Sequence, residues 1–325
     1  MDSGEVPVGL WPMIRALTCL LLCAAVPAFA KETPPGSRAA QPFDDATYDE
    51  RLDAIAEKLI ATGTFFRPAD VETSDKVRSV DAAPVPPATE RLAGAELYRR
   101  ASRSTLMLVA VSQKEWEDGK KAAAEDAAKA TPASRRRVVA GRGLRHRTAV
   151  GGATAFVVNG DGVVATCRHA LEFDGPFVLA AVTASGRYIP VTKILLSDKA
   201  TDLAFLKIDA TDLPALPLLG DISAGEPVRA FGGPSGYYFL MTDGIVSRHS
   251  VGDPDEKDPG GPRMPQLDIT ADIAEGSSGG PVFDLAGNVV GVSQSYAIAE
   301  NDDHETAFKH RAAIPAGRLL EKMKR

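Results

Sequence analysis

The sequence predicts an all-β fold for most of the chain, preceded by a helical N-terminal region. From Thr105 onward, short apolar runs rich in Val, Ile and Phe alternate with turns that contain Gly, Asp or Pro. Asn159-Gly160 and Asp161-Gly162 are dipeptides typical of tight hairpin turns. Because many short strands follow one another with few helical segments between them, the pattern favours an antiparallel barrel or sandwich.

The expected strands are short and closely spaced, as a barrel or sandwich requires. They cover residues 106–111, 154–158, 162–166, 177–184, 188–196, 203–208, 227–233, 244–250, 265–270, 280–284 and 288–297. A terminal helix is expected near residues 316–323.

The region before the strands has helical periodicity. Over residues 46–62, apolar side chains recur at the spacing of one helix face, and Thr47 with Glu50 has the pattern of a capping box. Residues 67–88 are rich in proline and are expected to form a linker. A short helix is expected over residues 90–100, with Thr89 as its N-cap.

The first thirty residues have the pattern of an export signal. A basic residue, Arg15, precedes a short apolar run, and Ala28-Phe29-Ala30 is a small-x-small cleavage site. The run is too short to span a bilayer, so no stable membrane insertion is expected. We therefore predict a signal peptide over residues 1–30, starting at Met13, and an exported protein, periplasmic or secreted.

Composition and cysteine content narrow the possibilities further. The net charge is −6 and aromatic residues make up only 6% of the chain, which argues against nucleic-acid binding. Cleavage after Ala30 would leave Cys167 as the one cysteine, so the fold must be held by core packing without an internal disulfide. We interpret Cys167 as a small buried apolar side chain.

Residues 113–147 interrupt the strands and are predicted to be an insertion. Residues 113–130 have the charged pattern of a solvated helix, and residues 135–147 are strongly basic. A loop of this length within a compact domain is usually functional or disordered.

Ser278 lies in a segment suited to a nucleophile. It stands within Glu-Gly-Ser-Ser-Gly-Gly-Pro. Glycines on both sides allow a tight turn that exposes the hydroxyl and lets a substrate carbonyl approach the main chain. The amides of Gly276 and Ser278 could then form an oxyanion hole, in which one donor is typically worth a factor of about 10²–10³ in rate.

His169 and Asp202 supply the other groups that acyl transfer to water requires. His169 directly follows a predicted strand, and Asp202 lies where a polar turn becomes the predicted strand of residues 203–208. A histidine at a strand end can take the proton of the serine, and an aspartate can orient the imidazole. The order His, Asp, Ser fits an enzyme with two barrels, of which the first supplies His169 and Asp202 and the second Ser278.

Four segments together resemble the HtrA/Deg branch of trypsin-like serine peptidases. They are TAFVVNGDGVVATCRHA, DKATDLAFLKI, VRAFGGPSG with TDGIVS, and TADIAEGSSGGPVFDLAGNVVGV. The resemblance covers residues 97–325 without the insertion, and residues 31–96 would be a helical and linker extension. It implies two packed antiparallel β-barrels and a serine endopeptidase whose catalytic residues are His169, Asp202 and Ser278.

The resemblance also implies partners and departures. Substrates would be proteins or peptides, no cofactor or metal would be needed, and the protein could form a homo-oligomer. Members of this branch usually continue into PDZ domains, whereas this sequence ends soon after residue 320. Ser277 stands where digestive enzymes have an aspartate, so activation by pairing with a freed N-terminus is not expected.

The substrate-binding residues are predicted from their distance to the nucleophile. Asp272 lies six residues before Ser278, where a carboxylate could favour Lys or Arg in a substrate; the alternative is an aspartate at the rim or on the surface. Val292, Ser293 and Gln294 are expected to pair with the substrate backbone by strand addition.

Two other functions remain open from the sequence. The Gly-Ser-Ser-Gly-Gly pattern formally fits an α/β-hydrolase, but that fold needs a helix after the serine, and here strand-like residues follow. The second is a protein-binding module that keeps the catalytic residues but lacks a working oxyanion loop.

Overall fold

A computed structural model describes residues 42–129, 151–252, 263–300 and 306–324. The predicted signal peptide and the basic residues 135–147 lie outside the described residues. Residues from Asp44 onward cluster as one compact unit, and everything below concerns that unit.

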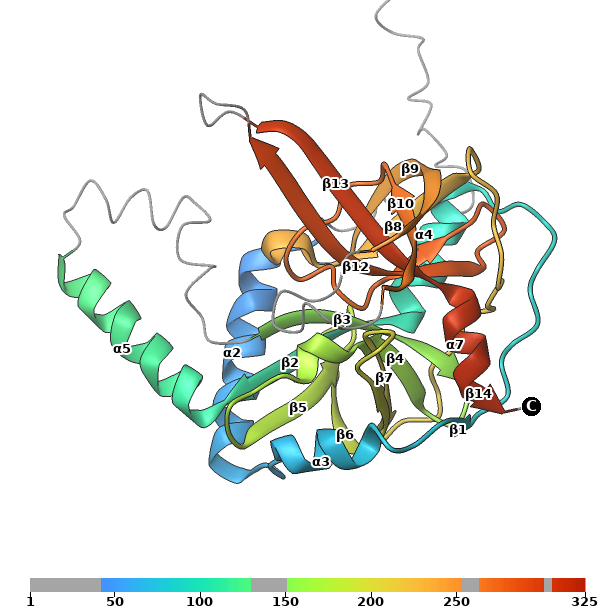
Figure 1. The fold of residues 1–325 in the computed structure, drawn as a ribbon. Helices are drawn as coiled ribbons and strands as arrows, with labels where there is room; N and C mark the ends of the chain where they lie inside the picture. Colours follow the sequence, from blue (N-terminus) through green and yellow to red (C-terminus); the bar gives the residue numbers. More distant parts are fainter. Residues whose placement is uncertain (1–41, 130–150, 253–262, 301–305, 325) are drawn as a thin grey trace, which may run out of the picture. The chain divides into compact units, whose positions relative to one another are not determined.

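The strands form two closed antiparallel barrels of six strands each (Figure 1). The first has the order β2-β3-β4-β7-β6-β5 and the second the order β10-β13-β12-β11-β8-β9. This confirms the predicted fold class. The first barrel consists of β2 (Thr105–Ser112), β3 (Gly151–Asn159), β4 (Val163–Cys167), β5 (Phe177–Val182), β6 (Tyr188–Asp198) and β7 (Leu203–Ile208). The second consists of β8 (Pro227–Gly232), β9 (Leu240–Val251), β10 (Pro265–Ile269), β11 (Pro281–Phe283), β12 (Val289–Glu300) and β13 (Thr306–Pro315).

The continuous apolar run of β2 is explained by burial on both of its faces. Alternate residues of a strand point to opposite faces of a sheet. Leu106 and Leu108 belong to the core of the first barrel, whereas Met107 and Val109 belong to a second cluster that also includes Phe231 of the other barrel. This second cluster joins the barrels, and burying each such side chain contributes about 1.5–3 kcal/mol.

The first helix, α2 (Asp45–Thr62), buries one face as predicted but begins differently. Tyr48, Leu52 and Leu59 are buried on that face. The N-cap is Asp44, whose carboxylate accepts from the amides of residues 46 and 47, so the predicted capping box of Thr47 and Glu50 is wrong. An aspartate in the extended backbone conformation caps a helix as well as a threonine does. Asp44 has this conformation and stands three residues before Thr47.

The predicted linker over residues 67–88 is wrong in its first part, which forms the helix α3 (Pro68–Ser74). Proline is favoured in the first turn of a helix because its missing N–H has no partner there anyway. Asp70 accepts from the amide of Arg67 and so closes the first turn. The proline that suggested a linker therefore begins a helix.

The remaining elements connect the barrels to the chain ends. Helix α4 (Gly94–Ser104) starts four residues later than predicted, with Ala93 rather than Thr89 as its N-cap. The terminal helix α7 (Ala316–Lys322) is followed by β14 (Met323–Lys324), which pairs with β1 (Val80–Asp81) in parallel.

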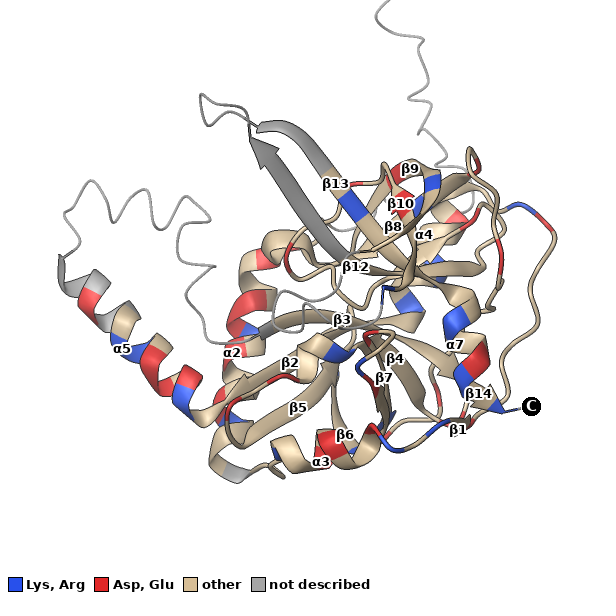
Figure 2. Cartoon of the chain, viewed as in Figure 1, with Lys and Arg blue, Asp and Glu red and all other residues tan. Residues whose placement is uncertain are grey.

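The insertion begins with the helix α5 (Gln113–Lys129), as its pattern predicted. It extends away from the first barrel, and acidic and basic residues alternate along it (Figures 1 and 2). In the described part of the chain, every helix is too short or too polar to cross a membrane.

Candidate active site

His169 and Asp202 meet at one end of the first barrel. His169 lies in a single 3₁₀ turn (Arg168–Leu171) directly after β4, and Asp202 lies in the turn between β6 and β7. Asp202 Oδ1 accepts from the main-chain amide of His169 at 2.9 Å, and Oδ2 lies 2.8 Å from the imidazole Nδ1. These two contacts fix both the position and the rotation of the imidazole ring.

The backbone of Asp202 is held in an unusual conformation. Its φ is +54°, a left-handed value that few residues other than glycine adopt, although aspartate tolerates it better than most. Its carbonyl accepts from the amide of Arg168 at 2.9 Å. The strain of the left-handed backbone, of order 1–3 kcal/mol, is therefore offset by contacts that aim the carboxylate at His169.

The side chains of His169 and Asp202 differ in their exposure to solvent. The imidazole is 42% exposed and the carboxylate 21%. The ring can therefore be reached from solvent while the group that orients it is largely covered.

Ser278 follows a tight turn at Ala274–Ser277 in the second barrel. The amide of Ser277 donates to the carbonyl of Ala274 at 2.9 Å, and the amide of Ala274 donates to the Ser277 hydroxyl at 3.2 Å. Gly276 has a φ of +89°, the value that the third residue of a type II turn requires. Ser277 therefore closes the turn through its own hydroxyl and main-chain amide.

The main chain at Ser278 packs directly on the first barrel. The amide of Thr154 donates to the carbonyl of Ser278 at 2.8 Å. Gly279 has a φ of +84°, and a Cβ at this position would overlap the carbonyl of Thr154 and the hydroxyl of Thr166. Only glycine allows this close approach, which brings the serine of one barrel against the strand that leads to His169.

Gln294 joins the three predicted catalytic residues. Its carbonyl accepts from the Ser278 hydroxyl at 3.2 Å, and its side-chain Nε2 donates to Asp202 Oδ2 at 3.1 Å. Because Asp202 also holds His169, one continuous chain of hydrogen bonds links Ser278, Gln294, Asp202 and His169. The structure therefore brings the three residues, which are far apart in sequence, to one place between the barrels.

The position of Gln294 results from a β-bulge. Ser293 pairs with Ala313 and Ser295 with Ala312, so that Gln294 is the extra residue on β12. A bulge of this kind redirects a side chain and is frequent beside active sites. The sequence predicted Gln294 as a substrate-pairing residue, and no local pattern announced its bond to Asp202.

The two predicted oxyanion donors lie on either side of Ser277. Among the hydrogen bonds between described residues, the amides of Gly276 and Ser278 donate to no partner. The Gly276 carbonyl is held by the hydroxyl of Thr154 at 2.7 Å, which fixes the peptide plane that follows it. Two neighbouring N–H groups without an internal acceptor can bind a developing negative oxygen.

Val292 and Ser293, which the sequence predicted to pair with the substrate backbone, lie within the sheet of the second barrel. Val292 pairs with Pro281 on one side and Ile314 on the other. The amide of Ser293 donates to the carbonyl of Gly280, and its carbonyl accepts from the amide of Gly279. The main-chain groups of both residues are therefore used for pairing within the barrel.

Asp272 is a surface residue with a basic partner. It lies after β10 with its side chain 75% exposed, and it forms an ion pair with Arg311 of β13. The Arg311 side chain is only 15% exposed. The carboxylate that was predicted to favour Lys or Arg in a substrate thus has a basic partner within the chain.

Cys167 is buried next to His169, as predicted for a small apolar side chain. Its thiol donates to the carbonyl of Ser293 at 3.3 Å. Ligand atoms of Cys167, His169 and Asp202 lie within 4.8 Å of one another, the one such group among the described residues. Burial, followed by the charge of Asp202, raises the pKa of the thiol well above its usual value. Metal binding needs a thiolate, so this group is poorly suited to hold a metal ion.

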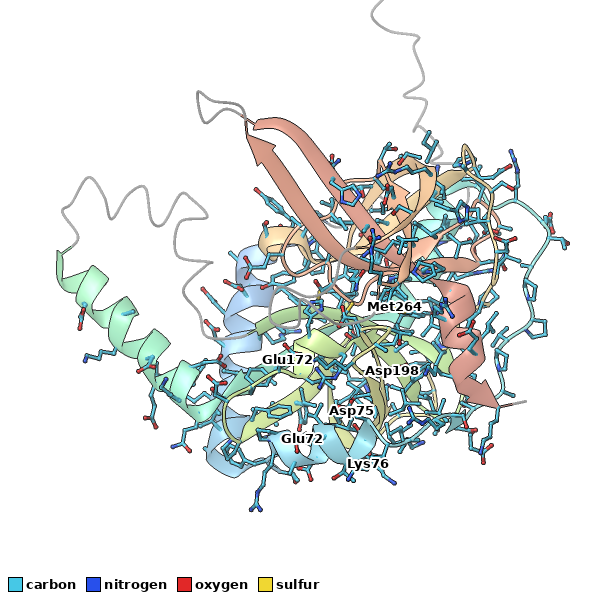
Figure 3. The ribbon with its side chains drawn as sticks, in the orientation of Figure 1. Glu72, Asp75, Lys76, Glu172, Asp198 and Met264 are labelled. Carbon is cyan, nitrogen blue, oxygen red and sulfur yellow. The ribbon has the colours of Figure 1, made fainter. Side chains whose placement is uncertain are left out.

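Arg168 is a site residue that the sequence analysis missed. Its guanidinium binds Asp75 through Nε at 3.3 Å and Nη2 at 3.2 Å, and Nη1 binds Glu172. Figure 3 shows Asp75 at the end of α3 and Glu172 beyond the histidine turn, on the same side of the first barrel. Ser197 also donates to Asp75. The turn that carries His169 is thereby tied to the N-terminal extension.

Comparison with known proteins identifies the central part of the chain. Residues 153–292 match the family model of the trypsin-like peptidase domain. Among curated relatives, a probable periplasmic serine endoprotease, DegP-like, from Pseudomonas fluorescens is 37% identical over 158 residues, covering 48% of this chain and 32% of the relative. One with the same description from Marinomonas sp. is 37% identical over 147 residues, covering 44% and 29%. The match thus spans about a third of the length of these relatives.

Solved structures with a similar fold are more distant in sequence. The active form of a protease from M. tuberculosis has a TM-score of 0.52 at 20% identity, covering 76% of this chain and 92% of that one. An HtrA-type protease solved with a tripeptide has a TM-score of 0.50 at 22% identity, covering 71% and 62%. At this level of identity the likeness shows the fold alone, and the fold is the double barrel described above.

Proposed function

We propose that this chain, which contains a trypsin-like peptidase domain related to the DegP-like endoproteases, is a serine endopeptidase that acts through an acyl-enzyme on Ser278. One observation carries the proposal above all. The hydrogen-bonded chain from Ser278 through Gln294 and Asp202 to His169 assembles nucleophile, base and orienting acid from both barrels.

The arrangement supports the following reaction. Asp202 holds the imidazole so that Nδ1 carries its proton and Nε2 acts as the base. As the Ser278 oxygen attacks the substrate carbonyl, Nε2 takes the hydroxyl proton and then passes it to the leaving amine. Water then attacks the ester, His169 accepts a proton from that water, and the same proton returns to Ser278 when the acid departs.

The amides of Gly276 and Ser278 would bind the oxyanion that forms at each tetrahedral stage. The turn at Ala274–Ser277 aligns both amides before substrate arrives, so no reorganisation is needed during the reaction. The substrate would lie along Gln294 and the following residues of β12, because the earlier residues of that strand are already paired.

Protein or peptide substrates outside the cytoplasm suit this proposal. The curated relatives are named periplasmic endoproteases, and residues 1–30 have the pattern of an export signal. We propose that the mature protein acts in the periplasm or beyond it.

The test is covalent labelling of the purified protein with a fluorophosphonate probe, which reacts only with an activated serine. We expect labelling at Ser278 in the parent, none in Ser278→Ala, and a loss of peptide turnover of about 10⁴–10⁶ in that variant. A matched control is Ser223→Ala, which removes an exposed hydroxyl before β8 and should retain labelling. A parent that never reacts would favour the protein-binding module instead.

A further inference from the structure

The N-terminal helix α2 contacts both barrels, and its contacts differ between them. On the first barrel, the Tyr48 hydroxyl donates to the carbonyls of Val182 and Thr183 at 3.2 and 3.0 Å. On the second, the helix meets the loop of residues 233–239 between β8 and β9, which we call the 233–239 loop. In Figure 1 the start of the blue helix lies beside this loop, which is drawn in pale orange.

Three groups of α2 hold one residue of that loop. The amide of Tyr238 donates to Asp45 Oδ1 at 3.0 Å, and its hydroxyl donates to Asp49 Oδ1 at 2.6 Å. Its ring packs on Tyr48 with the centroids 4.9 Å apart. Burial, and then the Asp49 carboxylate, raises the pKa of the Tyr238 hydroxyl, which therefore stays protonated and remains a donor.

The conformation of the 233–239 loop is strained and so depends on such support. Ser235 and Phe239 have φ values of +51° and +57°, which are rare for residues other than glycine. A backbone of this kind costs of order 1–3 kcal/mol per residue and persists only when surrounding contacts enforce it. Phe239 is 2% exposed and packs edge-on against Tyr48 at 5.6 Å, which provides part of this enforcement.

The other end of the loop touches the turn that presents the oxyanion amides. The amide of Ser235 donates to the carbonyl of Glu275 at 2.7 Å. The carbonyl of Gly233 lies where a Cβ on Gly276 would be. Thr154 links the two, since its hydroxyl donates to the Gly276 carbonyl at 2.7 Å and accepts from the Gly233 amide at 3.3 Å. The orientation of the Gly276 peptide thus depends on where the loop lies.

We propose that α2 is a positioning element of the active site, which holds the oxyanion turn in place through Tyr238 and the 233–239 loop. This inference depends on the proposed function, because it assigns a role to the same turn. It also gives the N-terminal extension a catalytic consequence: a chain whose helix has undocked from Tyr238 would keep its His169–Asp202 pair but lose alignment of the Gly276 amide.

The test compares two kinds of α2 contact in the full mature chain. Tyr238→Phe and Asp45→Ala each remove one bond to the loop. Arg51→Ala is the matched control, because Arg51 lies on the same helix but donates to the carbonyl of Ser185 on the first barrel at 2.9 Å. For each variant we would measure kcat and KM on a peptide substrate, well below the melting temperature, and the Ki of a peptide boronate that places an oxygen in the oxyanion hole.

For the two loop variants we expect kcat to fall about 10- to 100-fold, because part of an effect of about 10²–10³ for one oxyanion donor is lost. The boronate Ki should rise by a similar factor while KM changes less than about twofold. Amide hydrogen exchange over residues 274–280 should accelerate in these variants and not in Arg51→Ala. The rise in the boronate Ki and the confinement of faster exchange to residues 274–280 separate positioning from a general loss of stability. A general loss would lower the amount of active enzyme without weakening inhibitor binding.

Two results would overturn the inference. One is an unchanged kcat and unchanged exchange at residues 274–280 in both loop variants. The other is an equal loss in Arg51→Ala, which would mean that helix docking in general, and not the loop contact, matters. If the parent fails to react with a fluorophosphonate, the proposed function fails, while the exchange measurement still decides whether α2 orders the turn.

Discussion

Gln294 illustrates how one side chain can couple groups from both barrels. Its main-chain carbonyl accepts a hydrogen bond from the Ser278 hydroxyl. Its side-chain amide donates to Asp202 through Nε2 and accepts from Gln266 Nε2 at 3.1 Å through Oε1. We predict that Gln294→Leu lowers kcat/KM about ten- to hundredfold, since a hydrogen bond to a charged group contributes about 1.5–3 kcal/mol. The loss should fall on kcat, because Asp202 orients the base and does not touch the substrate.

Gln266→Leu is the matched control for this prediction. It removes the bond to the acceptor side of the Gln294 amide and leaves the donor to Asp202 in place. Steady-state kinetics of both variants on one peptide would check the assignment. Equal activity of Gln294→Leu and the parent would show that Asp202 is held sufficiently by His169 and its own turn.

Arg311 governs what Asp272 can do for substrate choice. As long as the two side chains pair, the carboxylate offers little to a basic substrate residue. We predict that Arg311→Ala increases cleavage after Lys and Arg at least about tenfold relative to other residues. Profiling of products from a peptide library would measure this, and Arg311→Ala combined with Asp272→Asn should abolish the gain. An unchanged profile would place Asp272 outside the substrate-binding region.

Helix α3 is anchored to the histidine turn by one largely buried ion pair. The Arg168 side chain is 11% exposed and that of Asp75 28%. Removing one partner of such a pair leaves the other charge without compensation, at a cost of about 3–5 kcal/mol when fully buried. We predict that Arg168→Ala lowers the free energy of unfolding by about 2–3 kcal/mol, measured by urea denaturation.

The control for this element is Lys76→Gln, an exposed residue two positions after the end of α3 (Figure 3). It should change the free energy of unfolding by less than about 0.5 kcal/mol. If Arg168→Ala were equally mild, α3 would be held by its apolar contacts alone.

The stability of the whole unit should depend on pH through Asp53 of α2. Burial, and then the charges of Asp49 and Glu50, raises the pKa of this carboxyl to about 6. Its unfolded value is about 3.9, so the folded state binds the proton more tightly. The resulting stabilisation is complete below about pH 4 and is lost as the pH rises through 6.

We therefore predict that Asp53→Asn raises the free energy of unfolding by about 1–2 kcal/mol at pH 7.5, after allowing for the partial exposure of the group. Near pH 4 the variant and the parent should be equally stable. Thermal unfolding of both across this pH range would check the sign. Glu57→Gln, on the exposed face of the same helix, should not reproduce the effect, and a constant difference at all pH values would contradict it.

The sequence alone determined the strand pattern, the order of the chemically active residues and the glycines beside Ser278. These features are local: alternation of side chains defines a strand, and Gly276 and Gly279 stand where the backbone needs positive φ. The resemblance carried by four segments then indicated two barrels, and the structure confirms that fold. The helix at residues 68–74 was missed because Pro68 reads equally well as a linker or as a first helical residue.

Only the tertiary structure decided which distant residues meet. Strand β13 has no clear apolar alternation and forms because closure of the second barrel pairs it with β10 and β12. Residues from separate elements meet in the Arg168–Asp75 pair and in the Arg311–Asp272 pair. They also meet at the bulge that places Gln294 beside Asp202. Such contacts depend on barrel closure and on the angle between elements, and a pattern of neighbouring residues carries no information about either.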